Sequence, residues 1–231
     1  MAERSWAREF TRMGAVAWKD LAVERRTKAN FNSVVFFAAL TLLLFGFALG
    51  ADTDALKAAS GGVLWLTVLF SGVLVFNRSY QTELDTGALE QLLLYPGERW
   101  AIFGGKLIAN LAFVLLVEAV ILPVAVVLYH MPLNSAPFGV IGVMLLGTLG
   151  FVTLGTFYAA MASRVRSREV LLPLLLFPML VPVLIAAVQA TTALLNGDAM
   201  GDSRTWVRLL VVFDVIFFVA ALLAFEHVIE G

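Results

Sequence analysis

Six charge-poor apolar runs, each long enough to cross a bilayer, constrain this chain more than any other feature. A helix rises 1.5 Å per residue, so about 20 residues cross a hydrocarbon core of about 30 Å. Backbone polar groups cannot go unpaired in lipid, so we expect each run to be a helix. The runs cover residues 31–50, 58–76, 107–129, 138–162, 170–191 and 205–225. The sequence therefore predicts an all-α, polytopic membrane protein whose single transmembrane domain covers residues 1–231.

The composition agrees with lipid as the main solvent. Apolar residues make up 61% of the chain, charged residues only 14%, and the mean hydropathy is +0.91. A soluble domain is nearer half apolar and a quarter charged. The absence of cysteine excludes a disulfide framework and a thiol nucleophile.

The sequence also lacks the glycine-rich loop that binds nucleotide phosphates. Gly104-Gly105-Lys106 is followed by Leu107 rather than Ser or Thr, and the upstream glycine of that motif is missing. No nucleophile–base pair or metal-ligand cluster is visible. We therefore expect no catalytic residue, no bound metal and no nucleic-acid partner, and any ATP must bind to a separate subunit.

The distribution of Lys and Arg predicts that both termini lie in the cytoplasm. Positive charge accumulates on the cytoplasmic side of membrane proteins. Basic residues precede the first run and follow the second and fourth, whereas the alternate loops carry only Lys57 and Arg204. The basic residues on the predicted cytoplasmic side are Arg4, Arg8, Arg12, Lys19, Arg25, Arg26, Lys28, Arg78, Arg99, Lys106, Arg164, Arg166 and Arg168. We expect a multi-pass membrane protein with both termini inside (N-in/C-in).

Residues 1–30 predict an amphipathic helix in the cytoplasmic interface of the membrane. An apolar stripe recurs at helical spacing, and arginines follow another face. The stripe consists of Trp6, Phe10, Met13, Ala17 and Leu21, and the arginines are Arg4, Arg8 and Arg12. The alternative is a solvated basic tail. The segment is too long and too charged for a signal peptide.

Residues 77–106 form the one long loop and contain a predicted short helix, over 82–95. Thr82 with Asp85 resembles a helix start, Gly87 allows a bend, and Pro96 with Gly97 marks the end. One face is predicted to be apolar (Leu84, Ala88, Leu89, Leu92, Leu93, Tyr95) and the other polar (Glu83, Asp85, Glu90, Gln91). The pattern leaves two interpretations open: the helix packs on its own membrane helices, or it fits a groove on a soluble partner.

The same loop carries a family resemblance. The run G-x-L-E-Q-L-L at 87–93, followed by Pro96 and by G-G-K-L at 104–107, resembles the first cytoplasmic loop of ABC-2-type permeases. More narrowly, it is similar to the membrane subunit of the bacterial cytochrome c maturation haem exporter, component B of the Ccm system. W-K-D-L-x-x-E-R-R at 18–26, N-R at 77–78 and F-P-M-L-V-P-V-L-I-A at 177–186 extend the resemblance over nearly the whole chain. Neither Glu118 nor the charged ending at 226–230 belongs to it.

This resemblance implies a permease that couples ATP hydrolysis by a partner to haem transfer, or to release of a haem-loaded chaperone. It implies a CcmA-like ATPase in a 2:2 complex, with further CcmC-like and CcmD-like membrane subunits. The helix at 82–95 would receive the ATPase motion through Glu83, Gly87, Leu89, Glu90, Gln91, Leu92, Leu93 and Pro96. Two alternatives stay open: an exporter of lipid, polysaccharide or drug, and a scaffold for haem-handling assembly that transports nothing.

Two acidic residues fall inside predicted spans. Glu118 lies in the third and Asp214 in the sixth, where an ionisable group is costly and is a functional candidate by default. Each is either a substrate or proton site, or a buried polar contact that fixes helix register.

Prolines and small residues mark the third, fourth and fifth runs. Pro123, Pro173, Pro178 and Pro182 predict kinks, which either shape the bundle or make a helix deformable enough to open a path. Gly155, Ala159 and Ser163 predict a ridge for close helix packing.

Haem itself is expected only as a transported or handled ligand. Its iron prefers His, Met, Cys or Tyr, and the chain offers just two histidines, His130 and His227, outside the apolar runs. The sequence therefore predicts no haem ligand.

Overall fold

The fold is a bundle of long helices. The computed structural model describes residues 2–87, 98–133, 136–163, 165, 168–198 and 201–230. These residues are almost entirely helical and contain no strand, so the predicted all-α class is confirmed. The helices are α1 (Ala2–Thr27), α2 (Ala29–Leu49), α3 (Thr53–Ser79), α4 (Gln81–Thr86), α6 (Trp100–Leu128), α7 (Pro137–Ala162), α8 (Arg168–Leu195) and α9 (Ser203–Glu230).

The six predicted spans are confirmed as helices. α2, α3, α6, α7, α8 and α9 are each long and apolar enough to cross a membrane. The helices extend beyond several of the predicted runs, and two of these extensions shorten the predicted loop, since α3 continues to Ser79 and α6 begins at Trp100. The connection between them is therefore shorter than the loop expected over 77–106, and Lys106 lies inside a helix rather than in that loop.

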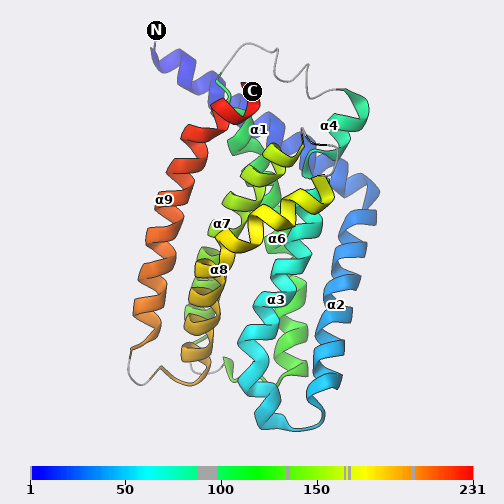
Figure 1. The fold of residues 1–231 in the computed structure, drawn as a ribbon, viewed down its shortest axis with the longest axis vertical. Coiled ribbons are helices and arrows are strands. Elements are labelled where there is room, and N and C mark those ends of the chain that lie inside the picture. Colours follow the sequence, from blue (N-terminus) through cyan, green and yellow to red (C-terminus); the bar gives the residue numbers. More distant parts are fainter. Residues whose placement is uncertain are drawn as a thin grey trace.

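Both ends of the described chain lie at the same end of the bundle (Figure 1). There α1 runs across the bundle and packs against α6, while α2 and α9 occupy opposite edges. Between them α3, α6, α7 and α8 form the interior. The outward faces of α2 and α9 are rich in exposed large apolar side chains, as expected of helices in lipid.

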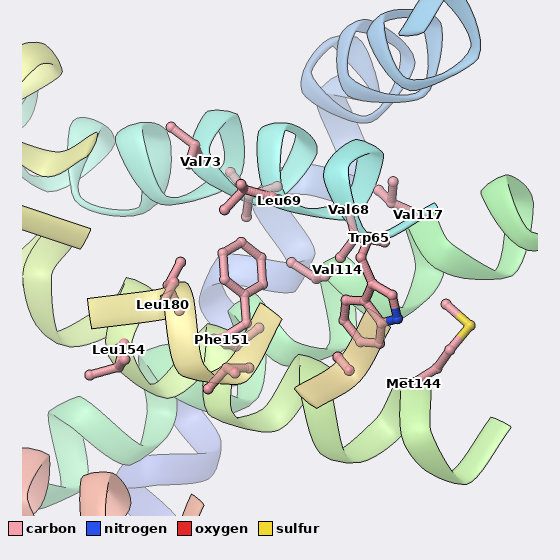
Figure 2. Packing of buried hydrophobic residues seen from close by; sticks show 14 of the residues in the cluster. Trp65, Val68, Leu69, Val73, Val114, Val117, Met144, Phe151, Leu154 and Leu180 are labelled. Atoms are coloured by element: carbon pink, nitrogen blue, oxygen red, sulfur yellow. The ribbon is translucent and has the colours of Figure 1, made fainter. Parts of the chain in front are cut away.

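The interior is held by aromatic rings seated on glycines. A Cβ at Gly155 of α7 would lie 2.0 Å from Phe76 Cε2 of α3, and one at Gly72 of α3 would lie 2.1 Å from Phe151 Cε1 of α7. Figure 2 shows the Phe151 ring directed at α3, close to Leu69 and to Leu180 of α8. This interlock confirms the predicted close packing at Gly155 and brings α3 and α7 together through apolar contacts.

All four predicted kink prolines lie inside helices. Pro123 is in α6, and Pro173, Pro178 and Pro182 are in α8. Figure 1 shows that α8 first runs obliquely across the bundle and then turns to follow it. Each proline removes a backbone donor, which gives a physical cause for this change of direction.

Candidate functional site: an ion cluster at the α1 end

Lys106, in the second turn of α6, places a charge in the interior of the bundle. Its side chain is only 1% exposed. The ammonium donates to the Ser79 carbonyl oxygen at 2.6 Å and to Glu83 Oε1 at 2.7 Å, and it lies 3.0 Å from Asp20 Oδ2. The Tyr80 ring centroid is 4.8 Å away. A buried charge is tolerated only when it is paired and hydrogen-bonded, and these contacts meet both conditions.

Two neighbouring residues of α1 complete the group. Lys19 donates to Glu83 Oε1 and lies 3.1 Å from Asp20 Oδ1. Burial alone would lower the pKa of Lys19, but its hydrogen bond to Glu83 and the charge of Asp20 outweigh burial and raise the pKa above its ordinary value. Lys19 therefore stays charged at neutral pH. We call Lys19, Asp20, Glu83 and Lys106 the ion cluster; its two cations and two anions balance.

The short helix α4 supplies Glu83. It follows α3 after Tyr80, and it ends at Gly87, whose φ of +67° is the left-handed conformation that glycine adopts without strain. The predicted helix start at Thr82 is wrong, since the helix begins at Gln81 and no side chain caps it. The helix predicted over 82–95 breaks at Gly87, and residues 88–95 lie outside the described residues.

The predicted polar face of this helix is partly buried. The Glu83 side chain is only 4% exposed, because Lys19 of α1 and Lys106 of α6 both bind it. Leu84 packs against the core as well, so of the residues expected on the polar face it is Asp85 that stays exposed in α4.

Two further polar contacts lie beside the cluster. Asn110 Nδ2, one turn along α6, donates to Ser79 Oγ at 3.0 Å and to Thr156 Oγ1 at 2.9 Å. These bonds join α3, α6 and α7. The ion cluster therefore sits on a hydrogen-bonded base formed by three membrane helices.

The remaining residues of the predicted coupling set cannot be placed. Leu89, Glu90, Gln91, Leu92, Leu93 and Pro96 lie outside the described residues. Of that set, the structure therefore places only Glu83 and Gly87, at the two ends of a single helical turn.

The acidic residues inside the spans lie apart from the ion cluster. Glu118 is about 18 Å further along α6 at 1.5 Å per residue. It is buried and accepts the Thr148 hydroxyl of α7. Asp214 of α9 is buried against Gly150 of α7, and within the described part of the chain its carboxylate oxygens have no hydrogen-bond partner. The two carboxyl groups contact the same turn of α7, Glu118 from α6 at Thr148 and Asp214 from α9 at Gly150.

The chain is similar to known proteins over nearly its whole length. The family described as CcmB protein matches residues 11–231, which is nearly the whole chain. The chain belongs to the CcmB family. Its relatives include heme exporter protein B of Pseudomonas aeruginosa, which is 28% identical over 79% of this chain and 81% of its own length. Heme exporter protein B of Paracoccus denitrificans is 29% identical over 84% and 87%, and that of Rhodobacter capsulatus is 30% identical over 75% and 79%.

In this member of the CcmB family, separate motifs meet at the ion cluster. W-K-D-L contributes Lys19 and Asp20, and G-G-K-L contributes Lys106. Glu83 comes from α4, four residues before the G-x-L-E-Q-L-L run begins. The sequence did not predict that Lys19, Asp20 and Lys106 belong to a site. They served only to show the family resemblance and, for the two lysines, the orientation in the membrane. One signal could have pointed to the cluster. Lys106, the third residue of the G-G-K-L motif, stands directly before an apolar run and has no acidic residue close to it in the sequence.

Proposed function

We propose that this chain is the membrane permease subunit of an ATP-driven haem exporter that serves cytochrome c-type biogenesis. Membership of the CcmB family and the name heme exporter protein B of its relatives support the assignment. The distribution of Lys and Arg supports an inner-membrane location with both termini in the cytoplasm. On this orientation the ion cluster faces the cytoplasm.

The position of Glu83 is the structural observation that carries the coupling role of this subunit. It is fixed to α1 through Lys19 and to α6 through Lys106, and it lies four residues before Gly87, where the segment 88–97 begins. A displacement of that segment would reach Glu83 through a single turn of helix. The ion cluster would then pass the displacement to α1 and to the membrane helices at the same time.

A separate ATPase must supply this displacement, because the chain has no phosphate loop. We propose a CcmA-like partner in a 2:2 complex with this subunit, together with CcmC-like and CcmD-like membrane subunits. We call the part of this subunit that would contact the ATPase and receive its motion the coupling segment. It consists of Glu83, Gly87, Leu89, Glu90, Gln91, Leu92, Leu93 and Pro96. ATP binds to the partner, and this subunit contributes no catalytic group.

Helix α1 acts in this proposal as an interfacial anchor. Trp6, Phe10 and Trp18 are more than half exposed, as expected of aromatic side chains at the level of the lipid headgroups. The same helix carries half of the ion cluster. The anchor therefore gives the coupling segment a fixed point at the membrane surface.

Inside the membrane, we assign Glu118 to helix register, because the Thr148 hydroxyl satisfies it across the α6–α7 contact. Prolines give α6 and α8 points at which they can deform: Pro123 in α6, and Pro173, Pro178 and Pro182 in α8.

Haem is proposed as a handled ligand, and we assign no residue of this chain to its iron. His130 is exposed just after the C-terminal end of α6.

The test is purification of the tagged chain from its native membrane, followed by identification of partners and a haem absorption spectrum. The proposal predicts an ATPase subunit in the preparation and loss of c-type cytochromes in a deletion strain. Normal c-type cytochromes in that strain would contradict the haem assignment and favour an exporter of another substrate. ATP hydrolysis in liposomes without haem movement would favour a scaffold.

A further inference from the structure

A cavity of about 130 Å³ opens beside the ion cluster, between α1, α2, α3 and α6. Part of its lining is charged, with Lys19 and Glu24 from α1 and Arg78 from α3. Asn30 of α2 lies between two of these charges: it accepts from Arg78 and donates to Glu24 Oε2 at 3.0 Å. The proposed function uses neither Arg78 nor Glu24, so this end of the cavity has no role in it.

The other part of the lining is apolar and lies deeper in the membrane. Each of the three spanning helices contributes one polar and one apolar residue to the lining, about one turn apart, and the apolar residue is the one further from the α1 end. The pairs are Asn30 and Val34 on α2, Arg78 and Leu74 on α3, and Asn110 and Phe113 on α6. One turn of helix is about 5 Å long, so the lining changes from polar to apolar within about 5 Å. A lipid changes from headgroup to hydrocarbon over a similarly short depth.

We propose that this cavity binds the headgroup of a phospholipid that carries a primary amine, of the phosphatidylethanolamine class. The phosphate would accept from Arg78, which uses one N–H group on Asn30 and has further donors, and from the half-exposed Lys19. The lipid ammonium pairs with the carboxylate of Glu24. The acyl chains leave along the apolar faces of α2, α3 and α6.

The charge of the lining selects this class over an anionic lipid. Three carboxylates, those of Asp20, Glu24 and Glu83, line the cavity with two cations, Lys19 and Arg78. Buried Lys106, which pairs with Asp20 and Glu83, brings the charges around the cavity into balance. A lipid with net negative charge and no ammonium would add an unbalanced negative charge to this neutral group and leave Glu24 without a new cation. A zwitterionic headgroup offers one charge to each set. The proposal requires the six helices to span a membrane and is independent of what the complex exports.

Native mass spectrometry of the detergent-solubilised, delipidated chain tests the site. Phosphatidylethanolamine and phosphatidylglycerol are added back at equal concentration, and lipid-bound masses are counted for each. The wild-type chain should retain one phosphatidylethanolamine in preference to phosphatidylglycerol. Arg78→Ala should lower this occupancy about tenfold, the equivalent of one lost charge-assisted hydrogen bond, whereas Arg204→Ala on exposed α9 should not.

Two further variants separate lipid binding from folding. Arg78→Lys keeps the charge and should restore part of the occupancy, and Ala109→Leu fills the cavity without altering a charge and should abolish it. Thermal unfolding checks that each variant is folded. Preference for phosphatidylglycerol would overturn the headgroup assignment. Equal retention of phosphatidylethanolamine by the wild type, Arg78→Ala and Ala109→Leu, or no retention by the wild type, would overturn the site.

Discussion

Lys106 carries the largest predicted energetic effect of any single residue in the ion cluster. It is buried with two carboxylates and a carbonyl oxygen around its ammonium. Lys106→Met should destabilise the protein by about 3–5 kcal/mol, since it leaves Glu83 and Asp20 with Lys19 as their only cation in the cluster. Thermal unfolding in detergent measures the effect.

Lys57→Met is the matched control, because Lys57 is exposed near the start of α3. Its unfolding temperature should stay close to that of the wild type. If the two variants lost the same stability, the ion cluster would not be a structural centre of the fold.

The contact between Thr148 and Glu118 gives a second prediction at the residue scale. Thr148→Val should cost about 1–3 kcal/mol, because it leaves a buried carboxyl group without its hydrogen-bond donor. Glu118→Gln should keep both stability and c-type cytochrome formation, since the amide oxygen still accepts the Thr148 hydroxyl. A stable Glu118→Gln variant that forms no c-type cytochrome would instead assign Glu118 to transport.

The sequence indicated some of these residues and missed how they meet. Glu83 and Gly87 could be selected from the loop pattern, and Glu118 and Asp214 from their positions inside apolar runs. The pairing of Lys19 with Glu83 joins residues 64 apart in the chain, and no local periodicity reports such a contact. The burial of Glu83 follows from its bonds to Lys19 and Lys106, and the helical pattern alone could not predict it.

Among the helices, the α3–α7 contact depends on aromatic rings over glycines. Gly155→Ala should destabilise the protein by about 1–3 kcal/mol, because its methyl group would overlap the Phe76 ring. Gly142→Ala on the same helix meets no atom within 4 Å and should be neutral. Phe76→Leu combined with Gly155→Ala should recover part of the loss in thermal unfolding. Equal stability of the two single variants would contradict this packing.

The docking of α1 on α6 depends on another glycine. A Cβ at Gly105 would lie 2.7 Å from the Met13 carbonyl oxygen, so Gly105→Ala should push α1 away from the bundle. Trypsin should then cleave the basic residues of α1 faster than in the wild type. Gly14→Ala, on α1 itself, meets no atom within 4 Å and is the control. Unchanged cleavage of Gly105→Ala would show that α1 does not need this close approach.

Hydropathy located the six long helices but not their ends. Polar residues such as Arg78 and Lys106 end an apolar run, although each continues its helix. Arg78 binds Asn30, and Lys106 binds Ser79 and Glu83, so both are satisfied within the bundle. Hydropathy averaged along the sequence contains no information on such tertiary contacts. The last turn of α3 and the first turns of α6 were therefore predicted to belong to a loop.

For the whole molecule, the chain is a six-span member of the CcmB family with the ion cluster at the end that holds both termini. Our central claim is that Glu83 joins the coupling segment to α1 and α6. The direct test compares Glu83→Gln with Asp85→Asn, an exposed carboxylate on the same turn of helix. Both variants are expressed in a strain that lacks the native chain.

The measurement is the ATP turnover of the purified complex, together with the c-type cytochrome content of the cells. Glu83→Gln should still co-purify with the ATPase subunit but lose most of the ATP turnover and most of the c-type cytochrome. Asp85→Asn should match the wild type in both. Wild-type turnover and cytochrome content in Glu83→Gln would contradict the central claim.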